Sequence, residues 1–116
     1  MTLYGIKNCD TVKKSRAWFA ARGIDMPFHD LRTDGLHADV LRRWLAAVGE
    51  ARLVNRSGTT WRALTSDQQA VREGDALIAL LLARPTLIRR PVVELADTVT
   101  VGFVPDAWAG LLEAGP

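Results

Sequence analysis

The clearest candidate for chemistry in this chain is Cys9, the one cysteine among 116 residues. Before it lies a short apolar and partly β-branched run, Thr2–Ile6, and after it lies a helix-forming run. A thiol at a helix N-terminus faces unpaired backbone N–H groups and the positive end of the helix dipole, which both favour the nucleophilic thiolate. Asp10 opposes the positive charge that three nearby lysines add, namely Lys7, Lys13 and Lys14. We therefore expect Cys9 to be a reactive nucleophile rather than an inert buried thiol.

The elements around Cys9 predict a strand–helix–strand unit. The first strand is Thr2–Ile6, and a helix is expected over Thr11–Arg22, ended by Gly23. Its inner side should carry Val12, Ser15 and Phe19, with Trp18 as a further candidate. A second strand is expected over Asp25–Leu31, where Pro27 favours an edge or a strand-start position. Two strands joined through one helix should run parallel.

The middle of the chain is expected to be helical. Apolar residues at helical spacing predict an amphipathic helix over Ala38–Val48. Leu53–Arg62 reads as irregular, and capping-box spacing from Thr65 predicts a short helix as far as Arg72, stopped by Gly74. Asp75 should cap a second helix over Ala76–Ala83, which is apolar nearly all round and should therefore be buried.

The last third predicts a hairpin and a final helix. Val92–Leu95 and Thr98–Phe103 are separated by a short polar turn, and Pro105 suits the first position of a helix running to about Leu112. The order β-α-β-α, helical insert, β-β-α is that of the thioredoxin fold. We therefore expect an α/β protein with a four-stranded mixed sheet, in one domain over residues 1–116 with a helical insert at about 50–86. In that fold a proline before the third strand, commonly with a cis peptide bond, faces the reactive cysteine, and Pro91 has the matching location.

Composition excludes several classes of protein. A formal net charge of +2 and scattered basic doublets do not make the clustered basic face of a nucleic-acid-binding protein, so we expect no nucleic-acid partner. The longest apolar run, Ala76–Ala83, is far shorter than the roughly 18 residues that span a bilayer, and Met1–Lys7 lacks the features of a signal peptide. One cysteine excludes a disulfide framework and a multi-cysteine zinc site. His29 and His37 are too far apart in the pattern to suggest a metal pair. We expect no metal, no membrane association, a monomer, and a reducing cytoplasm.

Three segments carry a resemblance to a known family. The chain resembles the arsenate-reductase-like (ArsC/Spx) family along essentially its whole length, and is most similar to the small YffB-type branch of the thioredoxin superfamily. The segments are Gly5–Thr11 (GIKNCDT), Leu53–Trp61 (LVNRSGTTW) and Leu87–Val93 (LIRRPVV).

The resemblance implies a thiol redox protein whose cysteine attacks arsenate or a disulfide and is regenerated by glutathione or glutaredoxin. Of the three arginines that hold the oxyanion in glutathione-coupled arsenate reductases, one corresponds to Arg90 and one to Arg56, or to Asn55 in a gapless alignment. The third corresponds to Phe103, which weakens the case for arsenate because each guanidinium pairs with the oxyanion. Spx regulators often carry Cys-x-x-Cys, but Val12 occupies the second position here.

We therefore expect a glutathione-dependent thiol oxidoreductase in which Cys9 forms a mixed disulfide. No bound cofactor is expected, and glutathione would be a co-substrate. Arg56 and Arg90 would bind a carboxylate or oxyanion, Pro91 would present backbone to the bound thiol, and Lys7 and Asn8 would support the sulfur through charge and hydrogen bonding. The sequence leaves open a non-catalytic, Spx-like regulator that binds RNA polymerase, and an arsenate reductase that has lost turnover.

Overall fold

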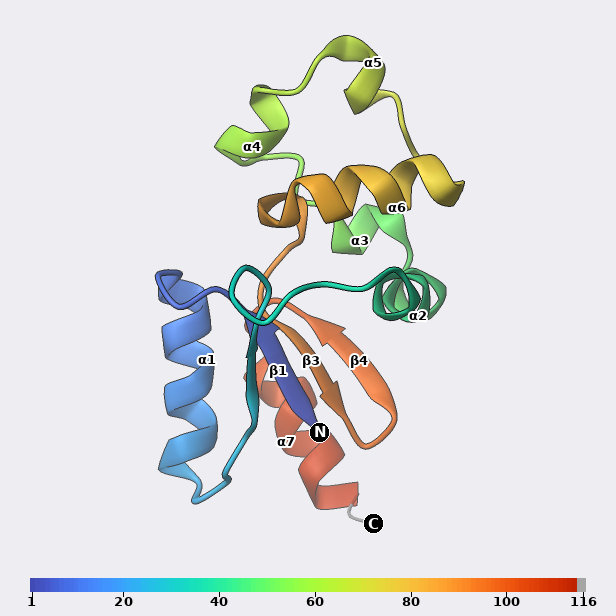
Figure 1. Cartoon of the computed structure of the whole chain (residues 1–116). Coiled ribbons are helices and arrows are strands. Elements are labelled where there is room, and N and C mark those ends of the chain that lie inside the picture. Colours follow the sequence, from blue (N-terminus) through green and yellow to red (C-terminus); the bar gives the residue numbers. More distant parts are fainter. Residues whose placement is uncertain (115–116) are drawn as a thin grey trace. The chain divides into compact units, whose positions relative to one another are not determined.

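The computed structural model describes residues 1–114, and the chain divides into two compact units (Figure 1). The first unit comprises residues 1–35 and the chain from Arg90 onward, and the second comprises Leu36–Arg89. The first unit contains β1 (Thr2–Gly5), α1 (Asp10–Ala21), β2 (Phe28–Asp30), β3 (Val92–Leu95), β4 (Thr98–Val101) and α7 (Pro105–Ala114). The second contains α2 (Ala38–Val48), α3 (Glu50–Leu53), α4 (Thr59–Arg62), α5 (Ser66–Gln69), α6 (Gly74–Ala83) and the 3₁₀ helix η1 (Pro85–Leu87).

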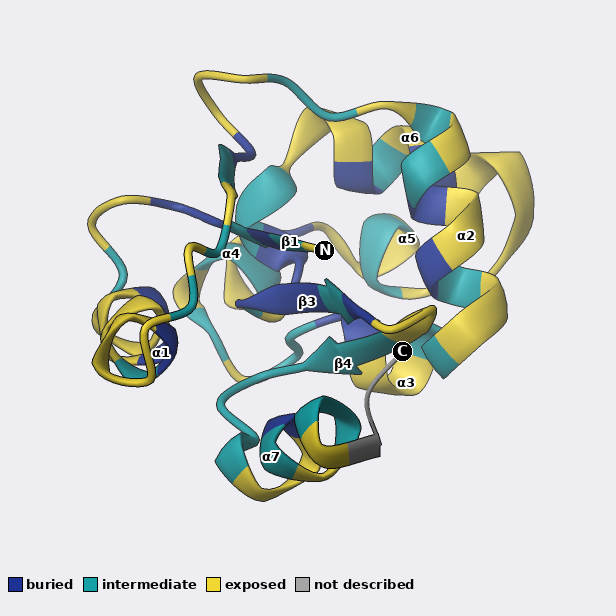
Figure 2. Ribbon diagram, turned by 90° about the horizontal axis from the view of Figure 1, so that it is seen from below, coloured by how far each residue is buried: buried dark blue, intermediate teal, exposed yellow. Residues whose placement is uncertain are grey.

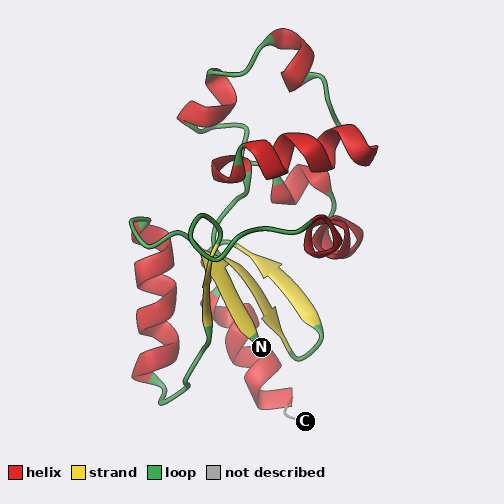
Figure 3. Cartoon of the chain, in the orientation of Figure 1, coloured by secondary structure: helices red, strands yellow, loops and turns green. Residues whose placement is uncertain are grey.

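The first unit is built on a four-stranded mixed sheet in the order β2-β1-β3-β4 (Figure 3). β1 pairs in parallel with β2, where Gly5 lies opposite Asp30. It pairs antiparallel with β3, where Tyr4 lies opposite Val92, and β3 forms an antiparallel hairpin with β4. The parallel β1–β2 pair and the final hairpin confirm the mixed sheet that the sequence predicts.

A hydrophobic cluster joins one face of this sheet to α1 and α7. Its buried members are Leu3, Val12, Phe19, Val93, Leu95 and Trp108. The Trp108 ring lies 4.9 Å from the Phe19 ring, and its Nε1 donates a 2.8 Å hydrogen bond to Thr100 Oγ1, so the polar atom of this fully buried indole is satisfied. Figure 2 shows the gradient within the sheet, with β3 buried and the edge strand β4 only partly so.

α1 covers Asp10–Ala21, so it begins and ends one residue earlier than the predicted Thr11–Arg22. Asp10 places an acidic side chain in the first turn, where it complements the helix dipole. Val12, Ser15 and Phe19 are the buried residues of the helix. Gly23 takes a φ of 71° and donates its N–H to Ala20 O at 3.0 Å, which closes the C-terminus in a conformation that glycine adopts without strain.

The second unit is a helical unit whose core lies between α2 and α6. Both helices turn buried side chains inward: Leu41 and Trp44 from α2, and Leu77, Ile78 and Leu81 from α6. The segments before α4 and after η1 lie side by side, because Val54 and Ile88 form an isolated antiparallel bridge and Arg89 N–H donates to Leu53 O at 2.8 Å. The capping box predicted at Thr65 is present, with both reciprocal hydrogen bonds to Gln68.

Several predicted boundaries were wrong. β2 is confined to Phe28–Asp30 rather than Asp25–Leu31, because β1 offers it only three partners and Pro27 has no N–H to donate. Leu53–Arg62 is not irregular throughout, since α3 ends at Leu53 and α4 covers Thr59–Arg62.

Three further ends differ from expectation. α5 ends at Gln69 instead of Arg72, and β4 ends at Val101 instead of Phe103. α6 begins at Gly74 instead of Ala76. The second unit takes in α2 as well as the expected insert at about 50–86, and the single-domain assignment stays a prediction.

Candidate functional site

Cys9 is the N-cap residue of α1. Its φ of −101° and ψ of 122° are extended, its carbonyl accepts the Lys13 N–H at 3.0 Å, and its own N–H donates to Ile6 O at 3.3 Å. The side chain makes no capping hydrogen bond, is half-buried, and packs against the hydrophobic cluster of the first unit. A free thiol therefore lies at the amino end of a 12-residue helix, partly open to solvent and backed by apolar groups.

Gly5 lets the strand before Cys9 approach the helix after it. A Cβ placed on Gly5 would lie 2.6 Å and 3.0 Å from the two γ-carbons of Val12, and at 2.6 Å the two carbon atoms would clash. The glycine of the Gly5–Thr11 motif therefore has a packing role. It allows the first turn of α1, which Cys9 caps, to lie directly on β1.

Lys7 and Asn8 form the exposed turn between β1 and Cys9. In the described part of the chain, neither side chain forms a hydrogen bond or an ion pair. The backbone N–H of Lys7, in contrast, donates to Asp30 Oδ2 at 3.2 Å. The support that the sequence predicts from the Lys7 and Asn8 side chains stays a prediction.

Asp30 is a residue of this region that the sequence analysis does not single out. It ends β2, is only 3% exposed, and accepts backbone N–H groups from Lys7, Arg32 and Thr33. Burial raises the pKa of the Asp30 carboxyl, but the N–H groups of Thr33, Arg32 and Lys7 and the positive charge of Lys7 outweigh it, so the pKa lies below its ordinary value. An aspartate near an Asp-Gly turn signals the turn, but nothing local signals a bond to Lys7, 23 residues away.

Pro91 lies at the same end of the sheet as the Cys9 loop. Since Tyr4 pairs with Val92, one further step along the antiparallel register brings Pro91 opposite Gly5. The Arg90–Pro91 peptide bond is cis, as expected for this location, and Pro91 O accepts the Gly102 N–H at 2.8 Å. Pro91 is buried and Arg90 is half-buried. The structure thus brings the Arg90–Pro91 segment and the Lys7–Cys9 turn to the same end of the sheet.

Phe103 stands where the resemblance would place a third arginine. It follows Gly102, and its ring packs edge-on against Trp108 with centroids 5.6 Å apart. The Lys14 ammonium lies 4.2 Å above the same ring, in cation–π geometry. This position is therefore an aromatic group of the hydrophobic cluster and has no guanidinium.

Arg56 belongs to the second unit, where its surroundings are well defined. Its guanidinium forms an ion pair with Glu50 and lies 5.2 Å from the Trp61 ring. The side chain is 25% exposed, and its Nε is buried without a hydrogen-bond acceptor among the described residues. The Asn55 side chain, in contrast, accepts two bonds from Ser57 and closes its own turn. Arg56 is thus a fixed, partly buried cation, and its role toward Cys9 stays a prediction.

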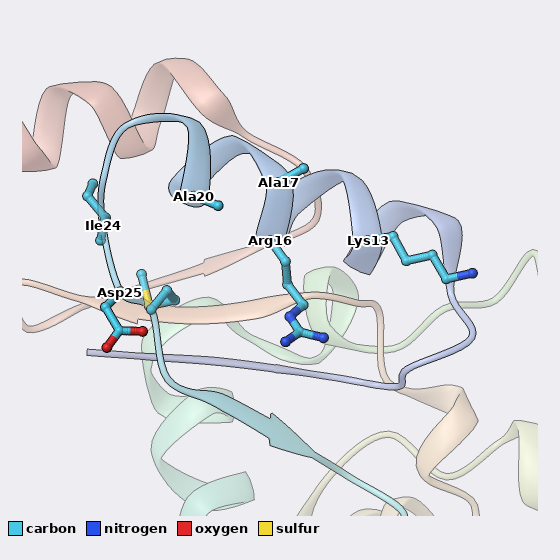
Figure 4. A pocket seen from close by; sticks show the side chains of 7 residues that line it. Lys13, Arg16, Ala17, Ala20, Ile24 and Asp25 are labelled. Atoms are coloured by element: carbon cyan, nitrogen blue, oxygen red, sulfur yellow. The ribbon is translucent and has the colours of Figure 1, made fainter.

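A cleft of about 390 Å³ runs along α1 (Figure 4). Its lining consists of Lys13, Arg16, Ala17, Ala20, Ile24, Asp25 and Met26. The Arg16 guanidinium is held over the Phe28 ring at 4.2 Å. Cys9 does not line this cleft, so it is separate from the thiol.

The described residues contain neither a metal-binding cluster nor a membrane-spanning helix. Among residues 1–114, no group of three or more His, Cys, Asp or Glu side chains is placed to bind a metal ion. Over the same range, no helix has the length and hydrophobicity needed to cross a bilayer.

The comparison that decides the family is the match of residues 4–111 to the model of the ArsC family. The chain belongs to the ArsC family. The solved structure of a YFFB protein is 45% identical in sequence, with a TM-score of 0.90. The match covers 96% of this chain and 97% of the YFFB chain. An arsenate reductase (ArsC) related protein from Brucella melitensis is 42% identical, with a TM-score of 0.73 over 97% and 93% of the two chains. The global transcriptional regulator Spx of Streptococcus pyogenes is 27% identical over 91% of this chain and 80% of its own.

These likenesses confirm the resemblance and the arsenate-reductase-like, thioredoxin-like fold that the sequence predicts. The Brucella melitensis protein is described as related to an arsenate reductase, and the Spx match shows that this chain is also similar to a transcriptional regulator. Membership therefore supports a thiol oxidoreductase-like role without selecting the substrate or the second thiol.

Proposed function

We propose that this ArsC-family protein is a thiol oxidoreductase whose Cys9 forms a mixed disulfide with glutathione. The observation that carries the proposal is the free, half-buried thiol at the N-cap of α1, at the end of the sheet that also carries cis-Pro91.

The chemistry is thiol–disulfide exchange. The Cys9 thiolate attacks one sulfur of a disulfide, a new S–S bond forms, and the other sulfur leaves as a thiolate. Because the chain has no second cysteine, an external thiol must attack the mixed disulfide and release Cys9 as a thiolate. Glutathione or glutaredoxin would supply that thiol. We place this reaction in the cytoplasm, where a lone thiol stays reduced.

The remaining site residues have proposed supporting roles. Arg90, half-buried next to cis-Pro91, would pair with a carboxylate of the bound thiol, and Pro91 would present its backbone beside it. Arg56, held by Glu50 and Trp61, would contribute a second cation. Lys7 and Asn8 would line the exposed turn in front of the sulfur.

Mass spectrometry of the intact protein after incubation with oxidised glutathione tests the proposal. Wild type should gain one glutathione and lose it on treatment with a reducing agent, whereas Cys9→Ser should gain none. An unmodified wild type, or an equal adduct on Cys9→Ser, would refute the proposal.

Arsenate is the less favoured substrate, because Phe103 packs against Trp108 and offers no guanidinium for a tetrahedral oxyanion. Arsenate-dependent oxidation of NADPH in the presence of glutathione and glutaredoxin measures this directly. We expect a rate no higher than that of Cys9→Ser. A clearly higher rate would make arsenate a substrate.

The second candidate function is a non-catalytic regulator, which the Spx match favours. Affinity capture with purified RNA polymerase distinguishes it. Stoichiometric binding that persists in Cys9→Ser, together with no glutathione adduct on the wild type, would favour the regulator over the oxidoreductase.

A further inference from the structure

The Asp30 carboxylate divides its two oxygens between two segments of the first unit. Oδ1 accepts the N–H groups of Arg32 at 2.8 Å and Thr33 at 3.0 Å, within the turn that follows β2. Oδ2 accepts the N–H of Lys7 at 3.2 Å, in the turn that precedes Cys9. A carboxylate that is only 3% exposed must satisfy its lone pairs internally, and these three N–H groups do so.

The bond to Lys7 is the tie between the Cys9 turn and β2. The last parallel contact of the two strands is Leu31 N–H to Gly5 O at 2.9 Å. After Gly5, the Cys9 N–H donates a local hydrogen bond to Ile6 O. Within the described residues, Lys7 N–H to Asp30 is the hydrogen bond that joins residues 6–8 to another element.

We propose that Asp30 is a positioning residue for Cys9, holding the Ile6–Asn8 turn so that the sulfur is presented in one place. This inference rests on the proposed function. Thiol–disulfide exchange needs the attacking sulfur in line with the bond that breaks, and small misplacements of a reacting group are costly in rate. Asp30 itself touches neither sulfur nor substrate, so it acts through the backbone of Lys7.

An electrostatic role for Asp30 would have the opposite consequence. A negative charge near a thiol disfavours the thiolate, so neutralising Asp30 would increase the thiolate fraction at a given pH. Loss of positioning instead lowers the rate at which the fully formed thiolate reacts. The pH profile of the Cys9 reaction rate separates the electrostatic role from the positioning role. The thiolate fraction sets the midpoint of this profile, whereas the orientation of the thiolate sets the rate on its alkaline plateau.

The experiment is the pH profile of Cys9 glutathionylation in wild type, Asp30→Asn and Asp34→Asn. Asp34 is the matched control, because its Oδ2 accepts the Asp30 N–H at 2.8 Å in the same turn without reaching Lys7. With rates corrected for the folded fraction, Asp30→Asn should lower the plateau about tenfold. Asp34→Asn should leave the plateau within about twofold, since Asp34 is exposed and its bond to Asp30 N–H does not involve residues 6–8. An unchanged plateau in Asp30→Asn, a shift of the midpoint alone, or an equal fall in both variants would overturn the inference.

A backbone substitution keeps the test decisive if Asp30→Asn does not fold. Cys9 permits ligation of a synthetic 1–8 segment to the remainder of the chain, so the Lys7 amide can be replaced by an ester. The ester removes the N–H that Asp30 accepts, and it also weakens Ile6 O, the acceptor of the Cys9 N–H. The ester at position 7 should lower the plateau, and a control ester at position 8, whose N–H has no acceptor among the described residues, should not. Equal plateaus for the two esters would refute positioning. If wild type gains no glutathione, the proposed function fails, and iodoacetamide alkylation provides the same plateau comparison for Asp30.

Discussion

Gly5→Ala should strain the contact between β1 and α1 on which the placement of Cys9 depends. The added Cβ would lie 2.6 Å from one γ-carbon of Val12 and 3.0 Å from the other. Val12 is fully buried on a helix, where a β-branched side chain has one strongly preferred rotamer and cannot turn away. Relief therefore requires the first turn of α1 to move, and Cys9 with it.

The expected change in unfolding free energy follows from the methyl group added at position 5 and the Val12 side chain that it meets. Overpacking of this kind costs about 1–3 kcal/mol in unfolding free energy. Val12→Ala alone removes two buried methyl groups and should cost about 2 kcal/mol. In the double variant the methyl group added at position 5 occupies part of the space left by Val12, so its cost should be lower than the sum of the single costs by about 1–2 kcal/mol.

The assay is urea unfolding of wild type, both single variants and the double variant, followed by tryptophan fluorescence and far-UV circular dichroism. Coincident transitions are required for the free energies to be comparable. Cys9 alkylation rates measured in parallel should change in Gly5→Ala and return toward wild type in the double variant. Additive costs, within about 0.5 kcal/mol, would refute the reasoning, as would a Gly5→Ala variant as stable as wild type.

Three other predictions concern Asp30, Trp108 and a surface ion pair. Because the pKa of Asp30 is lowered on folding, its contribution to stability is present above its unfolded pKa, about 3.9, and is lost as pH falls through the folded pKa. Asp30→Asn should therefore flatten the decline in stability at acid pH, measured by urea unfolding at pH 7 and pH 3; an equally steep decline would contradict this. Trp108→Phe removes the bond to Thr100 and buried ring area, and should cost about 1–3 kcal/mol by the same assay, whereas wild-type stability would contradict it. Asp75→Asn breaks an exposed pair with Arg42 and should leave the thermal midpoint unchanged within error; a clear fall would show that the pair stabilises the fold.

The sequence predicted those helices and helix ends that are determined by residues close together in the chain. The 11-residue helix α2 follows its amphipathic stripe without error, and the capping box at Thr65 and the left-handed Gly23 are both present. α3 and α4 were missed because a helix of four residues is too short to show a period. The end of β2 was missed because a strand extends only as far as its partner offers hydrogen bonds, and that partner is distant in the chain.

Much about the candidate site was already determined by the sequence. A lone cysteine between a β-branched run and a helix, with an Arg-Pro pair before a later strand, predicted Cys9 at the N-terminus of α1 and Pro91 at the start of β3. Both assignments depend only on the order of elements and on turn chemistry. Order along the chain is enough to predict which ends of parallel and antiparallel strands meet.

Tertiary structure alone decided which side chains support the site. The bond from Lys7 to Asp30, the Lys14 ammonium over Phe103 and the ion pair of Arg56 with Glu50 each join different parts of the chain. Such contacts depend on the depth of packing and on side-chain direction, which periodicity does not encode. The sequence therefore identified the candidate nucleophile Cys9, and the fold identified the buried Asp30 carboxylate that accepts the Lys7 N–H.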